Sequence, residues 1–202
     1  MKMKHAKAMF VGAATLLNAN SLAAAPVQWA ASNGGNDHWY EIVISPDMTW
    51  TTSATAAAAQ THAGLTGYLA TVTSAAEHAF LNTLRQPWEN NLFLGGSDQA
   101  SEGDWIWTTG PEAGTEIGGA NYANWIAGQP DDGNSPWFHQ NYLLGWFQGA
   151  DGWGDVDGAW KSQGYVAEFS ENPLTVVPVP AALPLLLVGL GSLGMMTRRR
   201  KV

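Results

Sequence analysis

The end of this 202-residue chain constrains it most, because residues 177–197 carry no charge and four basic residues follow at 198–201. At about 1.5 Å per residue, a helix of this length reaches roughly 30 Å, the thickness of the hydrocarbon core of a bilayer. Basic residues beside a membrane helix favour the cytoplasmic side. The sequence therefore predicts a C-terminal transmembrane helix, with the residues before it outside the cytoplasm.

The N-terminus predicts the same topology. Lysines at positions 2, 4 and 7 precede an apolar run at 8–17 and then small residues, which is the layout of a secretory signal peptide. We expect a signal peptidase to cut after Ala23, since a cut after Ala25 would place Pro26 directly behind the scissile bond. The alternative is an uncleaved anchor, although the apolar run is short for a membrane span. Residues 1–23 are thus predicted to be a signal peptide.

The region between the two ends is strongly acidic. Three of the nine Lys and Arg residues lie in the signal segment and four in the tail, so only Arg85 and Lys161 remain against seventeen acidic residues, a formal charge of 2 − 17 = −15. A surface of this sign repels phosphates, which argues against nucleic acid as a partner. Cations are better candidates, although acidic surfaces also serve solubility.

The same region contains no cysteine and is rich in tryptophan. The absence of cysteine excludes disulfides, thiolate catalysis and cysteine-ligated metals. Stability must come from packing, to which the eleven tryptophans contribute large apolar surfaces. Its length, about 150 residues, is enough for one domain with a sizeable core.

Helix patterns are confined to the first half of this domain and strand patterns dominate the second, which predicts an α+β fold. Residues 38–44 alternate in part and predict a strand. Residues 51–63 are rich in alanine and predict a helix, which Gly64 is expected to end in the left-handed conformation. Residues 68–72 predict a short extended segment.

A second helix is predicted to begin at Ser74. Ser74 and Glu77 have the spacing of a capping box, in which Ser74 accepts from the Glu77 N–H and the Glu77 side chain reaches back. Phe80 and Leu84 continue at helical spacing, and Pro87 prevents further extension. Short apolar runs then predict strands at 91–96, 104–109, 142–147 and 164–169, around a long polar stretch at 110–141.

In this order the segments resemble the C-type lectin-like domain, over residues 27–170. Eight motifs carry the resemblance: Trp39-Tyr40; Trp50 before the alanine-rich helix; residues 67–72 with Glu77, Phe80 and Leu81; 93–98; 102–107; Asn124-Trp125 with 128–131; 152–156; and 165–168. The resemblance implies two helices, antiparallel sheets and a long polar loop region. The disulfides usual in the family are absent here, and Tyr142 stands where a cysteine is common.

The resemblance also implies a calcium-dependent sugar site. In lectins of this family, a Gln-Pro-Asp or Glu-Pro-Asn triplet and a Trp-Asn-Asp strand hold a calcium ion that also coordinates sugar hydroxyls, and the peptide bond before the proline is cis. Residues 129–131 match the galactose-type triplet, and Asp155 matches the last Asp of the strand motif. The implied metal ligands are Gln129, Asp131, Gln140 and Asp155, and the implied carbohydrate contacts are Gln129, Asp131, Trp137 and Asp155.

Two positions depart from the family pattern, because Gly154 replaces the Asn of the strand motif and Gln140 stands where a Glu is common. Water, Asp132 or Asp157 could supply the missing ligand. The other interpretation is a polar loop whose Asp and Gln side chains bond nearby backbone amides, as in Asx turns. Trp137 could stack on a sugar ring or pack beneath its own loop.

The tail resembles the sorting signals of the PEP-CTERM class, in the variant written Val-Pro-Leu-Pro-Ala. The motif residues are Val177, Pro178, Val179, Pro180 and Ala181, and residues 171–176 form a linker before the signal at 177–202. The resemblance implies an exosortase-type enzyme that removes the tail in a Gram-negative bacterium making extracellular polysaccharide. The chain would then pass through the inner membrane to the cell surface or matrix. The alternative is a permanent single-span anchor.

These observations favour an exported, surface-sorted and non-catalytic lectin-like protein that binds extracellular glycan with calcium. The alternative is a structural or protein-binding module of the same fold without a functional sugar site. An enzyme is disfavoured, because no spacing singles out a glycosidase pair of carboxylates and no nucleophile motif occurs.

Overall fold

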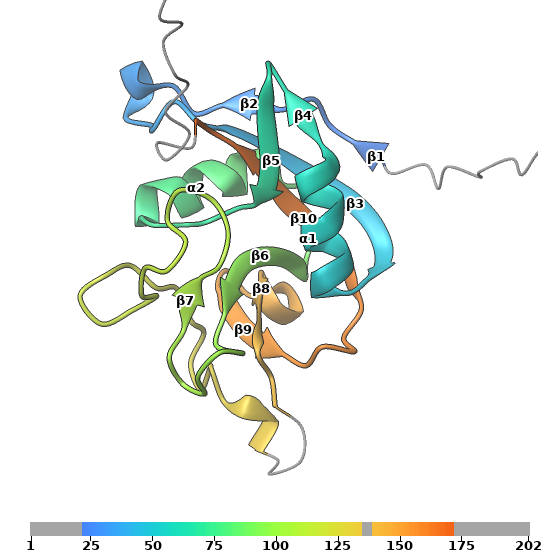
Figure 1. Cartoon of the computed structure of the whole chain (residues 1–202), viewed down its shortest axis with the longest axis vertical. Coiled ribbons are helices and arrows are strands. Elements are labelled where there is room, and N and C mark those ends of the chain that lie inside the picture. The colour runs from blue at the N-terminus through green and yellow to red at the C-terminus, as the bar shows by residue number, and fades with distance from the viewer. Residues whose placement is uncertain (1–21, 135–138, 172–202) are drawn as a thin grey trace, which may run out of the picture.

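A computed structural model describes residues 22–134 and 139–171 of the chain (Figure 1). Residues 1–21 of the predicted signal peptide, the linker from residue 172 and the predicted sorting signal lie outside these residues, as does Trp137. Within the two described ranges, no helix is long and apolar enough to cross a membrane. The domain combines two α-helices with one large sheet, which confirms the predicted α+β class.

The sheet has the strand order β1-β3-β10-β6-β8-β9. These strands span Leu22–Ala23 (β1), Trp39–Met48 (β3), Ser162–Phe169 (β10), Leu92–Ser97 (β6), Tyr142–Gly145 (β8) and Trp153–Val156 (β9). Three further strands pair with this path: Val27–Gln28 (β2) with β3, Leu65–Leu69 (β5) with β10 and Ile106–Trp107 (β7) with β6. Strand Thr61–His62 (β4) pairs with β5.

The first and last long strands, β3 and β10, lie side by side and antiparallel. The resemblance implies antiparallel pairing throughout, but β10 pairs with β6 in parallel, so the sheet is mixed. The edge strand β1 pairs with Val43 and Ile44 of β3, and it falls inside the segment that the predicted cleavage after Ala23 would remove.

Helix α1 spans Trp50–Ala59 and ends four residues before its predicted end. Thr49 caps it by accepting from Thr52 N at 3.2 Å. The expected role of Gly64 is wrong: Gly64 has the predicted positive φ (85°), but it follows Ala63 (φ 51°) in the turn between β4 and β5. Two successive residues with positive φ are typical of tight hairpin turns, so the glycine closes a hairpin rather than the helix.

Helix α2 spans Ala75–Leu84, as predicted, and only half of its expected capping box is present. Ser74 Oγ accepts from Glu77 N at 3.1 Å. The Glu77 carboxylate does not return to Ser74 but accepts from Thr73 N at 2.7 Å and from Thr73 Oγ1 at 3.0 Å. Glu77 is buried, because Tyr40 Oη also donates to it and draws it inward.

The sheet and helices enclose two apolar clusters. One contains Tyr40, Leu94, Trp107 and Trp153, and the other contains Val43, Phe93 and Phe169. Neighbouring residues such as Phe93 and Leu94 enter different clusters because side chains alternate along a strand. In its described part, the long segment between β7 and β8 contains one short 3-10 helix, Asp132–Asn134 (η2). This helix lies at the lower end of Figure 1, away from β1, β2 and β4.

Candidate functional site

The long loop and β9 meet through the residues that the sequence singles out. The Gln129–Pro130 peptide bond is cis. Gln129 Oε1 accepts from Asp155 N at 3.0 Å, so the triplet is bonded to the strand backbone. The Asp155 carboxylate accepts from Asp131 N (3.1 and 3.2 Å) and from Asp132 N (2.8 Å). Gln129, Asp131 and Asp155 therefore form one cluster, although Asp155 lies more than twenty residues from the triplet in the sequence.

Asp155 is the buried anchor of this cluster, with 1% of its surface exposed. Burial raises the pKa of its carboxyl, while the N–H groups of Asp132 and Asp131 oppose this shift by donating to the charged form. The two oxygens of the Asp155 carboxylate make three contacts with the backbone amides of Asp131 and Asp132, and these contacts shape the loop. The loop conformation thus depends on an acceptor in β9 rather than on packing alone.

Gln140 lies on the other side of the short helix η2. Its backbone N donates to Asp132 Oδ1 at 2.7 Å. Its side-chain Oε1 is buried and has no hydrogen-bond partner among the described residues. A buried oxygen without a donor costs free energy, on the order of 1–3 kcal/mol, unless a cation or water satisfies it. This oxygen is therefore available as a metal ligand.

The position of Phe147 accounts for the glycine at position 154, where the strand motif of the family has Asn. A Cβ at this position would lie 2.5–2.8 Å from ring atoms of Phe147, which is too close for any side chain. Phe147 is itself buried and packs in the second apolar cluster. An oxygen ligand at position 154 would therefore require Phe147 to move.

A second group of hard ligands escaped the sequence analysis. One ligand atom each from Glu102, Asp132 and His139 lies within 4.8 Å of the others. His139 Nδ1 is 3.2 Å from Asp132 Oδ2 and 3.3 Å from Glu102 Oε2. Burial, then the negative charges of Asp98 and Asp132, raise the pKa of Glu102. The sequence did not predict Glu102 as a metal ligand, because the long loop separates the turn before β7 from η2 in the chain.

Another cluster of carboxylates lies between β3, α2 and β10. Tyr40 Oη is 2.5 Å from Glu77 Oε1 and 3.3 Å from Glu168 Oε1, and His38 Nδ1 is 2.6 Å from the same Glu168 oxygen. Burial, then the charge of Glu168, raise the pKa of Glu77 to about 7. Burial lowers the pKa of His38, but the hydrogen bond and charge of Glu168 outweigh it, so the net pKa is raised.

Comparison with known proteins identifies relatives of this domain. Residues 47–155 match the family model of the lectin C-type domain. Over 139 residues, 65% of the chain, it is 37% identical to Halomucin of Haloquadratum walsbyi, of which the match covers 1%. Over 101 residues, 48% of the chain, it is 34% identical to an alpha-N-acetylgalactosamine-specific lectin of Patiria pectinifera, of which it covers 54%.

Solved structures agree on the fold. C-type lectin CEL-I from Cucumaria echinata superimposes with a TM-score of 0.53 at 27% identity, over 67% of this chain and 92% of that one. Human lithostathine superimposes with a TM-score of 0.52 at 20% identity, over 68% and 86%, which is evidence for the fold alone. With the family model matched from residue 47 to Asp155, this chain belongs to the C-type lectin domain family.

Proposed function

We propose that this chain is an exported, non-catalytic lectin whose domain binds extracellular carbohydrate through calcium at the long loop. The observation that carries the proposal is the junction of Gln129, Asp131 and Asp155, with the unpartnered oxygen of Gln140 nearby in the loop. The name of one relative, an alpha-N-acetylgalactosamine-specific lectin, supports a carbohydrate of the galactose type.

The donor set fits calcium, which takes six to eight hard oxygens at flexible geometry. Gln129, Asp131, Gln140 and Asp155 would hold the ion, and it would supply open coordination positions for sugar hydroxyls. Asp132, whose backbone N donates to Asp155, would offer a further carboxylate in place of the missing ligand at position 154. Asp155 shapes the loop through the backbone amides of Asp131 and Asp132.

The second candidate is a structural or protein-binding module of the same fold. It is favoured by the Asx-type contact in which Gly133 N donates to Asp131 Oδ1 at 3.0 Å. In this arrangement the loop oxygens serve the loop itself. Binding of a protein partner that persists in Asp131→Ala would support this second function.

Export and sorting rest on the sequence of the two ends. We infer that a signal peptidase removes residues 1–23 and that an exosortase-type enzyme recognises Val177–Ala181 at the inner membrane of a Gram-negative cell. Intact-mass measurement of the protein extracted from the cell surface tests this. A mass that retains residues 177–202 would contradict processing and leave a permanent anchor.

The carbohydrate proposal is tested with the full-length protein on a glycan array that includes galactose and N-acetylgalactosamine ligands. We expect calcium-dependent retention that a chelator abolishes, together with a lower melting temperature after chelation. Melting and glycan binding that are both indifferent to calcium would overturn the mechanism. Hydrolysis of any glycan in a polysaccharide panel would contradict the non-catalytic role.

A further inference from the structure

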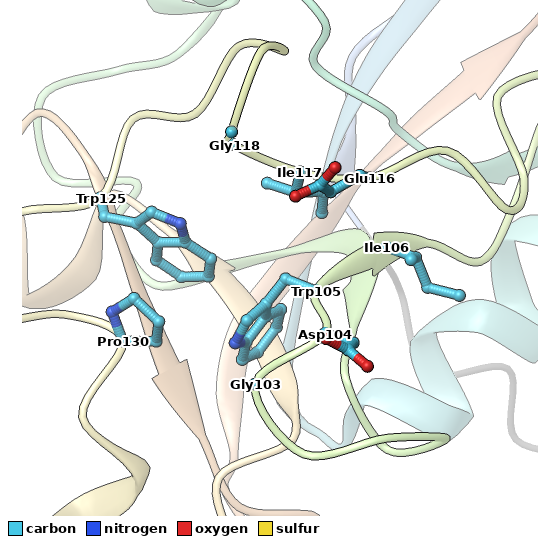
Figure 2. Close-up of a pocket in the computed structure, with 10 residues that line it drawn as sticks. Gly103, Asp104, Trp105, Ile106, Glu116, Ile117, Gly118, Trp125 and Pro130 are labelled. Carbon is cyan, nitrogen blue, oxygen red and sulfur yellow. The ribbon is translucent and has the colours of Figure 1, made fainter.

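A pocket of about 510 Å³ shares one wall with the triplet loop (Figure 2). Its lining comes from residues 103–106, residues 116–119, Trp125 and Pro130. Pro130 separates Gln129 from Asp131, so the pocket lies directly beside the proposed sugar site. Its volume falls in the range of small-ligand pockets, roughly 300–1,000 Å³.

Two indole rings form the rigid part of this pocket. Trp105 and Trp125 meet edge to face, with ring centroids 4.8 Å apart and an interplanar angle of 69°. Trp125 also packs edge to face against Trp153, with ring centroids 5.9 Å apart. Next to it, Ile126 N donates to Trp153 O at 3.0 Å. A ligand would therefore meet a preformed aromatic surface, which reduces the entropic cost of binding.

The charges around the pocket are all negative. Glu116 and Asp104 are its charged lining residues, and both are exposed. Ser101 Oγ donates to Asp104 at 2.6 Å, whereas the Glu116 carboxylate accepts no hydrogen bond from the described part of the chain. Figure 2 shows Glu116 on the same opening as Trp125, Pro130 and Trp105.

Glycine keeps the space beside Glu116 open. Gly119 has φ +61°, and a Cβ there would lie 2.8 Å from Glu116 Oε1. The adjacent Gly118 also has a positive φ, +91°, which side chains rarely adopt. The rim consequently presents backbone and a carboxylate, without a side chain that blocks entry.

An aromatic surface with a carboxylate beside it is suited to a ligand with an apolar ring face and an ammonium group. We propose that this pocket binds an amino-sugar residue with a free amine, adjacent to the glycan residue at the triplet. The inference rests on the proposed glycan binding and extends it by a second subsite with its own charge preference. Glu116 would pair with the ammonium and the partly buried Trp125 would contact the ring, while Trp105, 5% exposed, would support Trp125 from the core.

The test compares a galactosamine trimer with its fully N-acetylated counterpart, by calorimetry on the full-length protein. We expect tighter binding of the free amine, and Glu116→Gln should weaken that ligand about tenfold while leaving the acetylated trimer within about twofold. Asp104→Asn provides a second variant with a smaller effect of the same sign. Asp47→Asn is the matched control, because Asp47 is exposed, lies outside the pocket and loses the same charge.

The outcomes separate this subsite from the calcium site. An amine preference that survives chelation and disappears in Glu116→Gln supports the subsite, even if galactose binding proves independent of calcium. Equal affinity for the two trimers overturns the proposal. Weakening by Asp47→Asn as large as that by Glu116→Gln also overturns it, because the effect would then come from net charge alone.

Discussion

Among the buried carboxylates of the described residues, Asp155 at the long loop and the pair Glu77 and Glu168 in the core have different surroundings. Asp155 receives backbone N–H groups of the long loop, which favour its ionised form. Glu77 and Glu168 share the hydroxyl of Tyr40 and are close enough to disfavour each other's charge. Glu77 and Glu168 also accept from backbone amides, those of Thr73 and Thr71, so the difference from Asp155 is that these two acids share one hydroxyl in the core.

Substitution of Asp155 should give the largest difference between the two groups. Asp155→Asn removes the buried negative charge while keeping one acceptor for the loop amides. We expect calcium affinity, measured by calorimetry, to fall by more than roughly 100-fold, with a stability loss in chelator of about 1 kcal/mol. Asp47→Asn should change neither quantity. An unchanged calcium affinity would place the ion elsewhere, most simply at Glu102, Asp132 and His139.

Restoring the family's Asn tests whether packing or chemistry limits the loop site. Gly154→Asn should reduce the free energy of unfolding by about 2–3 kcal/mol, because the new side chain collides with Phe147. Calcium affinity should not improve. Urea denaturation and calcium titration of the variant measure the two effects. Tighter calcium binding with an unchanged free energy of unfolding would show that the Phe147 side chain can move aside at little cost.

Tyr40→Phe addresses the structural cluster. The variant leaves Glu77 and Glu168 without the hydroxyl between them, and we expect a loss of about 2 kcal/mol in the free energy of unfolding. Calcium affinity should remain within twofold of the parent protein, roughly the error of such comparisons. A large loss of calcium affinity would contradict the separation of the two groups.

The pH dependence of stability should give the smallest effect. The folded pKa of Glu77, about 7, lies above its ordinary value, so its stabilising contribution is full below that ordinary value and is lost as pH rises through 7. We expect the free energy of unfolding, measured in chelator, to fall by about 1 kcal/mol between roughly pH 6 and 8. His38 contributes with the same sign, because its pKa is also raised.

Glu77→Gln is the control for this titration, since a neutral side chain of the same size replaces the acid and keeps one of its two acceptor oxygens. The slope of stability against pH should be smaller in this variant. A slope equal to that of the parent protein would falsify the assignment to Glu77.

Local patterns predicted the elements whose signals lie close together in the chain. The strand at residues 38–44 and the helix from Ser74 are present because alternation and capping act over a few residues. Gly64 was assigned to the wrong element, since a left-handed glycine serves a helix end and a hairpin turn equally well. The Glu77 side chain also departs from its pattern, because Tyr40 on β3 competes for it.

The sequence alone determined the fold class, the acidic charge, and the two ends that predict export. It also singled out Gln129, Asp131 and Asp155 through a resemblance in motif order. Only the tertiary structure decided that a ligand at position 154 would require Phe147 to move, that Glu102 joins Asp132 and His139, and that Pro130 borders a pocket of tryptophan and carboxylate. The physical reason is that periodicity and capping depend on neighbours in the chain, whereas a binding site depends on which distant side chains fill the same space.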